Sequence, residues 1–79
     1  MLADALEHLV RGIVDHPDDV HVRAASLRRG DLLEVRVNPE DLGRVIGRGG
    51  RTARALRTVV GALSRDGAVR IDVVDVDRR

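Results

Sequence analysis

A turn with three glycines among clustered arginines is the part of this chain whose residue types most clearly suggest chemistry. Gly47, Gly49 and Gly50 can adopt backbone angles that other residues avoid, and they place no side chain between the main chain and a guest. Arg48 lies at the tip of the turn, and Arg51 follows it. Backbone N–H groups and guanidinium groups together suit phosphate oxygens. The sequence therefore predicts that this turn contacts a phosphodiester chain.

The charge of the chain is concentrated around this turn. The 79 residues carry a net charge of only +1. Residues 42–65 contain no acid, and their six arginines are Arg44, Arg48, Arg51, Arg54, Arg57 and Arg65. That window carries +6, so the remaining residues must sum to −5. A nearly neutral chain with one basic patch directs its attraction for an anionic partner to that patch.

Two helices are expected on either side of the turn. Asn38 is a good N-cap, Pro39 suits the first helical position, and the helix should stop at Gly47. Its buried face should consist of Leu42, Val45 and Ile46. The second helix should direct four apolar residues inward, namely Leu56, Val59, Val60 and Leu63. Arginines three residues apart on that helix share its outer face: Arg51, Arg54 and Arg57.

The rest of the chain should support these two helices. An apolar helical face is formed by Leu2, Leu6, Leu9, Val10 and Ile13, with an end expected at Asp15-His16-Pro17. Strands are expected over 20–24, 33–37 and 69–73, with turns at Arg29-Gly30-Asp31 and Asp66-Gly67 and a frayed tail over 75–79. The order is α-β-β-α-α-β. It predicts an α+β fold in which three helices cover one face of a three-stranded mixed sheet, whose last two strands run parallel if they are neighbours.

The segment Val45-Ile46-Gly47-Arg48-Gly49-Gly50-Arg51-Thr52-Ala53-Arg54-Ala55-Leu56 resembles the signature of the KH domain, an apolar pair followed by Gly-x-x-Gly and a helix. The element order resembles the type II arrangement. Nearly the whole chain is similar to the small bacterial KH proteins of the KhpA type. The resemblance implies a single KH domain over residues 1–79 that binds about four nucleotides of single-stranded RNA.

The resemblance also implies which residues bind RNA: Val45, Ile46, Gly47, Arg48, Gly49, Gly50, Arg51 and Arg54. The acid-free window of arginines adds Arg44 to this candidate site. The apolar pair would form a wall for the bases, and the loop would clamp the backbone. Gly49 departs from the family, in which a polar side chain is more frequent. The family further implies a bacterial RNA chaperone or post-transcriptional regulator, self-association, and a larger RNA-binding partner that carries its own KH module.

Two other nucleotide-binding motifs fit the residues less well. Arg51, Arg54 and Arg57 could lie in a major groove as part of a helix-turn-helix, but the flanking strands and the triple-glycine turn do not suit that motif. A P-loop needs Gly-x-x-x-x-Gly-Lys-Ser/Thr, and this chain has no Lys there. The chain also has no Phe, Tyr or Trp for the stacking platforms of RRM and many OB-fold proteins. An aliphatic KH groove does not need them.

Other classes of function are expected to be absent. His16 and His21 are five residues apart across a proline, which is not a zinc spacing, so we expect no metal or cofactor. No nucleophile-base spacing is present, so we expect no enzyme. The lack of cysteine, of a leader and of a membrane span predicts a cytoplasmic protein. The remaining alternative is a protein-interaction module that dimerises or docks a larger KH-containing partner through the loop or the sheet edge.

Overall fold

The computed structural model describes residues 2–28, 30–64 and 69–76. Its helices and strands follow the predicted α-β-β-α-α-β order, with two short 3-10 turns in addition. The elements are α1 (Leu2–Arg11), η1 (Pro17–Asp19), β1 (His21–Leu27), β2 (Gly30–Val37), α2 (Pro39–Ile46), η2 (Arg48–Gly50), α3 (Arg51–Leu63) and β3 (Val69–Asp75).

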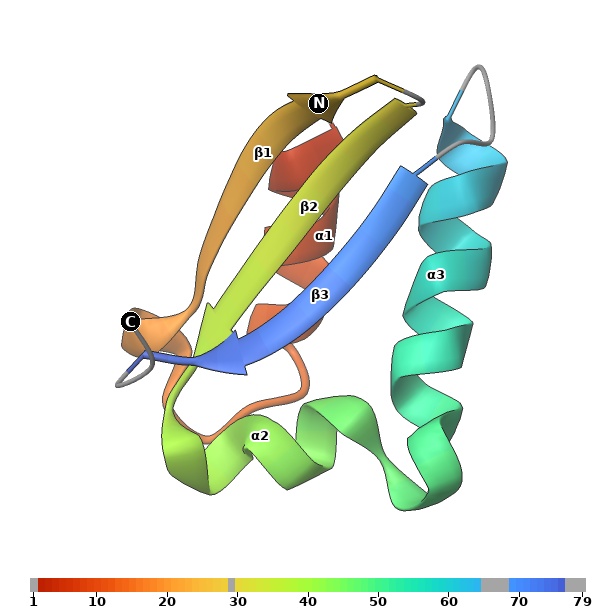
Figure 1. The fold of residues 1–79 in the computed structure, drawn as a ribbon. Coiled ribbons are helices and arrows are strands. Elements are labelled where there is room, and N and C mark those ends of the chain that lie inside the picture. Colours follow the sequence, from red (N-terminus) through yellow and green to blue (C-terminus); the bar gives the residue numbers. More distant parts are fainter. Residues whose placement is uncertain (1, 29, 65–68, 77–79) are drawn as a thin grey trace.

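The three strands form one mixed sheet in the order β1-β2-β3. β1 pairs with β2 antiparallel, and β2 pairs with β3 parallel, as the sequence predicted. Figure 1 shows α1 behind the sheet, α2 crossing at its lower end and α3 standing beside β3. The α+β architecture with a type II KH-like order is confirmed. In this arrangement β3 is an edge strand, and its outer edge lies next to the helix that carries the arginines.

The core forms where the sheet meets the helices. Leu33, Val35 and Val37 alternate along β2 and are at most 2% exposed, as their spacing predicted. Between them, Glu34 and Arg36 form an ion pair with the guanidinium Nε 2.9 Å from Oε1. The other buried apolar residues among those described are Leu6, Val10, Val20, Val45, Ala53, Leu56, Val60 and Ile71. Burial of one face of the sheet thus fixes its register.

Several predicted boundaries were wrong. The strands predicted over 20–24, 33–37 and 69–73 extend over His21–Leu27, Gly30–Val37 and Val69–Asp75. α1 ends at Arg11 rather than near residues 15–17, because Gly12 follows and weakens the helix. Ile13 still packs against the core from a turn in which its N–H donates to the Val10 carbonyl at 3.0 Å. In the hairpin, Gly30 pairs with Leu27, so Gly30 and residue 31 belong to β2 and not to the turn.

Three further predictions fall partly or wholly on positions outside the described residues. These are the part of the first turn at Arg29, the turn at Asp66-Gly67 and the end of the tail over 77–79. The described start of the tail is ordered by pairing: Val76 donates its N–H to the Val37 carbonyl at 2.8 Å. The prediction that the chain frays from residue 75 was therefore wrong for residues 75 and 76.

The predicted inward face of α3 was half wrong. Val59 and Leu63 are 45% and 58% exposed. The buried residues of α3 are Ala53, Leu56 and Val60, which follow an i, i+3, i+7 pattern. A helix of this length against a narrow sheet buries one such stripe, and Val59 and Leu63 lie on the side adjoining it. Ile46, also expected in the core, is 38% exposed at the end of α2.

Candidate nucleic-acid interface

The helix before the turn begins and ends where its residue types predict. The Asn38 Oδ1 atom accepts the Glu40 N–H at 2.8 Å, and Pro39 occupies the first helical position. At the other end Gly47 donates its N–H to the Gly43 carbonyl at 2.8 Å and adopts a φ of 78°. The chain then turns sharply toward α3.

The glycines of the turn serve two different purposes. A Cβ atom on Gly47 would lie 2.7 Å from the Thr52 nitrogen and would also meet the Thr52 hydroxyl, so the close approach of the two helices requires glycine here. Gly49 and Gly50 have φ values of 63° and 76°, yet a Cβ on either would meet nothing within 4 Å. These two positions need glycine for their backbone angles only. They leave the tip of the loop bare and open to a guest.

Four arginines around and beyond the loop are exposed: Arg48, Arg51, Arg54 and Arg57. Within the part of the chain that the structure describes, none of the four forms an ion pair with an acid. The first turn of α3 also directs its N–H groups and the positive end of its dipole at the loop. Positive charge and hydrogen-bond donors therefore converge beside the bare backbone.

Arg44, also predicted to be a site residue, is placed differently. Its guanidinium Nη1 lies 3.0 Å from the Asp15 carboxylate Oδ1. Asp15 stands 29 residues earlier, outside the acid-free window, so the sequence spacing did not reveal this ion pair. Of the apolar pair, Val45 is fully buried in the core, whereas Ile46 reaches the surface.

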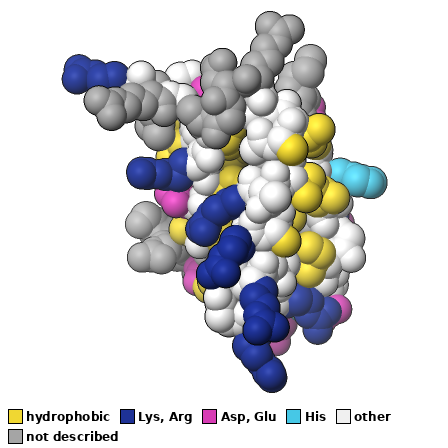
Figure 2. All heavy atoms as spheres, turned by 90° about the vertical axis from the view of Figure 1, so that its right-hand side faces the viewer, with side chains coloured by type: hydrophobic (Ala, Val, Ile, Leu, Met, Phe, Trp, Pro, Cys, Tyr) yellow, Lys and Arg dark blue, Asp and Glu magenta, His cyan; other side chains and the backbone are white. Residues whose placement is uncertain are grey.

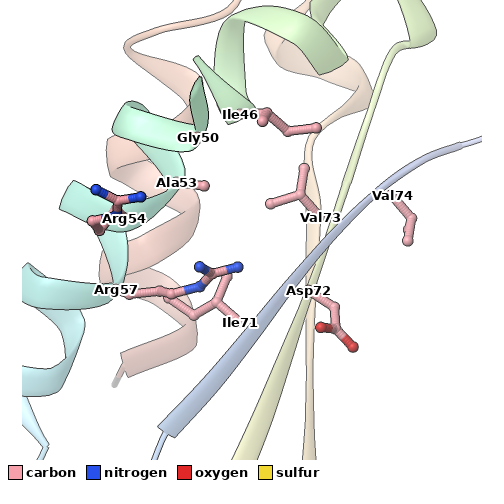
Figure 3. A pocket seen from close by; sticks show the side chains of 9 residues that line it. All are labelled: Ile46, Gly50, Ala53, Arg54, Arg57, Ile71, Asp72, Val73 and Val74. Carbon is pink, nitrogen blue, oxygen red and sulfur yellow. The ribbon is translucent and has the colours of Figure 1, made fainter. Parts of the chain in front are cut away.

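A groove of about 530 Å³ lies between α3 and β3 and ends at the loop. It is lined by Ile46, Gly50, Ala53, Arg54, Arg57, Ile71, Asp72, Val73 and Val74. Figure 3 shows Arg54 and Arg57 on the helical side, with Ile71 and Val73 turned toward α3 from the strand. We did not predict from the sequence that β3 forms one wall of the groove. The predicted parallel pairing of the last two strands could have indicated it. Arg57 was also left out of the site, although it continues the three-residue spacing of the arginines.

The backbone of β3 adds polar groups to this wall. Val37 lies opposite Asp75 in the parallel register, and it accepts the N–H of the next residue, Val76. Residues of a parallel strand alternate in the direction of their N–H and C=O groups. Ile71 and Val73 alternate with Val76 in the same way as Asp75. Their backbone N–H and C=O groups therefore point away from β2 and toward the groove. An unpaired strand edge can form hydrogen bonds with a guest.

Figure 2 shows the face of the molecule that α3 dominates. Arginine side chains follow its lower and left parts, and hydrophobic side chains form a band on its right. The exposed uncharged residues of α3 include Ala55, Val59, Ala62 and Leu63, and α1 contributes Leu9.

Among the described residues, no helix has the length and apolar character to cross a bilayer, and no three potential ligands are grouped around a metal position.

Comparison with protein families decides the classification. Residues 3–76 match the model of the KH domain of KhpA and KhpB. The chain belongs to the KhpA/KhpB KH-domain family. The predicted resemblance is thereby confirmed.

Curated relatives agree with this classification. The "RNA-binding protein KhpA" of Streptomyces coelicolor is 71% identical over 77 residues, covering 98% of this chain and 96% of the relative. The protein of that name from Mycobacterium tuberculosis H37Rv is 60% identical over 78 residues, covering 99% and 96%. The one from Halalkalibacterium halodurans is 44% identical over 72 residues, covering 89% and 95%. These three relatives are therefore of nearly the same length as this chain.

Proposed function

We propose that this chain binds single-stranded RNA without catalysis, with the Gly47–Gly50 loop holding the sugar-phosphate backbone and the adjoining groove receiving the bases. The observation that carries this proposal is the bare tip of the loop at one end of an arginine-lined groove. Three relatives that bear the name RNA-binding protein support it. As part of the proposal, the protein acts in the bacterial cytoplasm as an RNA chaperone or post-transcriptional regulator.

The groove suits a single strand better than a duplex. Its walls are aliphatic, with Ile46 at one end and Ile71 and Val73 along β3. Unpaired bases can rest against such walls and form hydrogen bonds with the edge of β3, whereas the bases of an A-form duplex are turned inward. Phosphates would then lie on the side of α3, near Arg54 and Arg57 and the loop.

The test is charge reversal at the tip of the loop. Arg48→Asp combined with Gly49→Asp should lower the affinity for single-stranded RNA about a hundredfold, roughly 3 kcal/mol, because two carboxylates would then face the phosphates. The fold should survive, since Asp tolerates the left-handed conformation of position 49 better than most residues. Ultraviolet crosslinking and fluorescence anisotropy measure binding, and circular dichroism measures the melting temperature.

The matched control makes the same change in charge on the opposite edge of the sheet. Arg23→Asp with Ser26→Asp alters two exposed residues of β1, which is separated from β3 by β2. This control should keep most of the RNA affinity. Equal affinities of the loop variant and the control would refute the proposed site, and full affinity of the loop variant would refute the role of the loop.

We also propose that the chain forms a homodimer, favoured by the uncharged stripe of α3. Ala55, Val59 and Leu63 are exposed at i, i+4, i+8, and α1, which contacts α3, exposes Leu9. This stripe lies apart from the arginine side of the same helix (Figure 2). A second copy of the chain is the occupant, because the stripe offers no charge for an unlike partner and two identical stripes can face each other about a twofold axis. Docking of a larger KH-containing protein is the competing use of the stripe.

Val59→Asp tests the dimer, because it places a charge in the centre of the stripe without touching the core. Light scattering should change from a dimer mass to a monomer mass, whereas Arg57→Asp, on the arginine side of the same helix, should leave the dimer intact. A wild-type chain that stays monomeric at millimolar concentration would refute the homodimer.

A further inference from the structure

The groove does not end at Arg57. A second concavity of about 380 Å³ lies farther along the boundary between α3 and β3, lined by Arg57, Val69, Arg70, Ile71 and Asp72. Three of these residues, Arg57, Ile71 and Asp72, also line the first groove. The two hollows therefore adjoin each other, and Arg57 lines both.

The direction of the elements makes this a linear path. α3 leads away from the loop, while β3 runs back toward it from Val69, as Figure 1 shows. The first groove reaches along β3 as far as Ile71, and the second concavity continues to Val69, two residues farther from the loop. Two strand residues span about 7 Å. At the stacked spacing of about 3.4 Å per nucleotide, this length adds room for about two nucleotides.

The charges along this path favour phosphates. Arg57 and Arg70 are both exposed, and within the described ranges neither is paired with an acid. Both line the second concavity, Arg57 as a residue of α3 and Arg70 as a residue of β3. Among the described residues, Asp72 is the one acid that lines the path, and Figure 3 shows its carboxylate turned away from α3. Arg70 lies two residues before Asp72 and therefore on the same face of β3. Two guanidinium groups against one carboxylate still leave the second concavity with a net positive charge.

We infer that the chain binds a single strand longer than the four nucleotides of a KH groove, with Arg57 and Arg70 holding the phosphates of the additional nucleotides. This inference rests on the proposed RNA binding and extends the same site along β3. It assigns to Arg70 a role in binding that depends on the length of the ligand. Arg54 and the loop act on every ligand, whereas Arg70 acts only on a strand long enough to reach it.

The experiment compares a tetranucleotide with an octanucleotide of the same RNA composition. Fluorescence anisotropy should show tighter binding of the octanucleotide than its additional binding registers explain. Arg70→Gln should weaken octanucleotide binding about fivefold, lower the slope of log affinity against log salt by about one, and leave tetranucleotide binding unchanged. Arg23→Gln, a variant of an exposed arginine on the far strand, should change neither affinity.

The outcomes distinguish a failure of the proposed longer site from a failure of the proposed RNA binding on which it rests. If both oligonucleotides bind through the loop but Arg70→Gln has no effect, or weakens both equally, the extension is wrong and RNA binding stands. If the octanucleotide gains nothing beyond the statistical factor, the extension is also wrong. If neither oligonucleotide binds, or the Arg48→Asp, Gly49→Asp variant binds as the unaltered chain does, the proposed function itself fails and the extension fails with it.

Discussion

The two ends of α2 are both polar, but they use their polar groups in opposite ways. At the first end, Asn38, Glu40 and Asp41 each form hydrogen bonds or ion pairs with groups of this chain. At the second end, the bare backbone around Gly49 and the guanidinium of Arg48 face solvent. The comparison separates polar residues that build the fold from polar residues that remain for a ligand. One short helix carries both kinds.

The first end is a clamp between α2 and the segment 15–19. Asp41 is only 1% exposed, and its carboxylate accepts the backbone N–H groups of Asp15 at 3.1 Å and His16 at 3.0 Å. Asn38 donates its side-chain amide to Asp19 at 2.9 Å, and the imidazole of His16 lies 3.0 Å from the Glu40 carboxylate. These contacts fix the start of α2 and thereby the place from which the loop projects.

Among the variants that test this comparison, Asp41→Ala should have the largest effect, and the effect should be on stability. Removal of the carboxylate leaves two backbone N–H groups without their acceptor and opens a cavity, which should lower the free energy of unfolding by about 3 kcal/mol. Urea denaturation measures the loss. RNA affinity at a temperature where the variant is folded should stay within a factor of about two, because Asp41 does not line the groove.

Asp41→Asn is the control for the clamp. Its amide keeps one oxygen as an acceptor, so the loss of stability should lie between those of Ala and the unaltered chain. Unchanged stability of Asp41→Ala would show that the clamp does not support the fold. A folded Asp41→Ala variant without RNA affinity would place Asp41 in the binding site and erase the contrast.

A smaller effect should separate the glycines at the second end. Gly47→Ala places a Cβ 2.7 Å from the Thr52 nitrogen and should destabilise the fold by about 2 kcal/mol, since the two helices must move apart. Gly49→Ala meets open space and should lose only about 1 kcal/mol through its left-handed backbone. Thermal melts monitored by circular dichroism give the order. Equal losses would mean that the approach of α2 to α3 is not limited by Gly47.

Local rules predicted much of the frame of this site. Asn38 and Pro39 mark the start of a helix by their own chemistry, and the alternation of Leu33, Val35 and Val37 shows a half-buried strand. The glycine turn could be predicted because its left-handed backbone angles favour glycine independently of the surrounding structure. Features that depend on a residue and its immediate neighbours could therefore be predicted from the order of the amino acids alone.

Features that depend on distant segments could not. Val59 and Leu63 are apolar, and the sequence does not show that the sheet leaves room for only one buried stripe of α3. The groove wall of β3 comes from a strand about twenty residues after the loop. The same limitation applies to Arg44, which appeared as one of six unopposed arginines until the fold brought Asp15 to it.

The smallest expected effect separates these arginines by their partners. Arg54→Gln removes an unpaired guanidinium from the groove and should weaken RNA binding about sixfold, roughly 1 kcal/mol. Arg44→Gln should weaken it less than twofold, because the charge of Arg44 is already balanced by Asp15 at 3.0 Å. The exposed ion pair itself is worth at most about 1 kcal/mol, so stability should change little. Titrations at two salt concentrations compare the variants, and only Arg54→Gln should reduce the salt dependence. A larger loss for Arg44→Gln would mean that the ion pair opens to release Arg44 to the ligand, and both ends of α2 would then take part in binding.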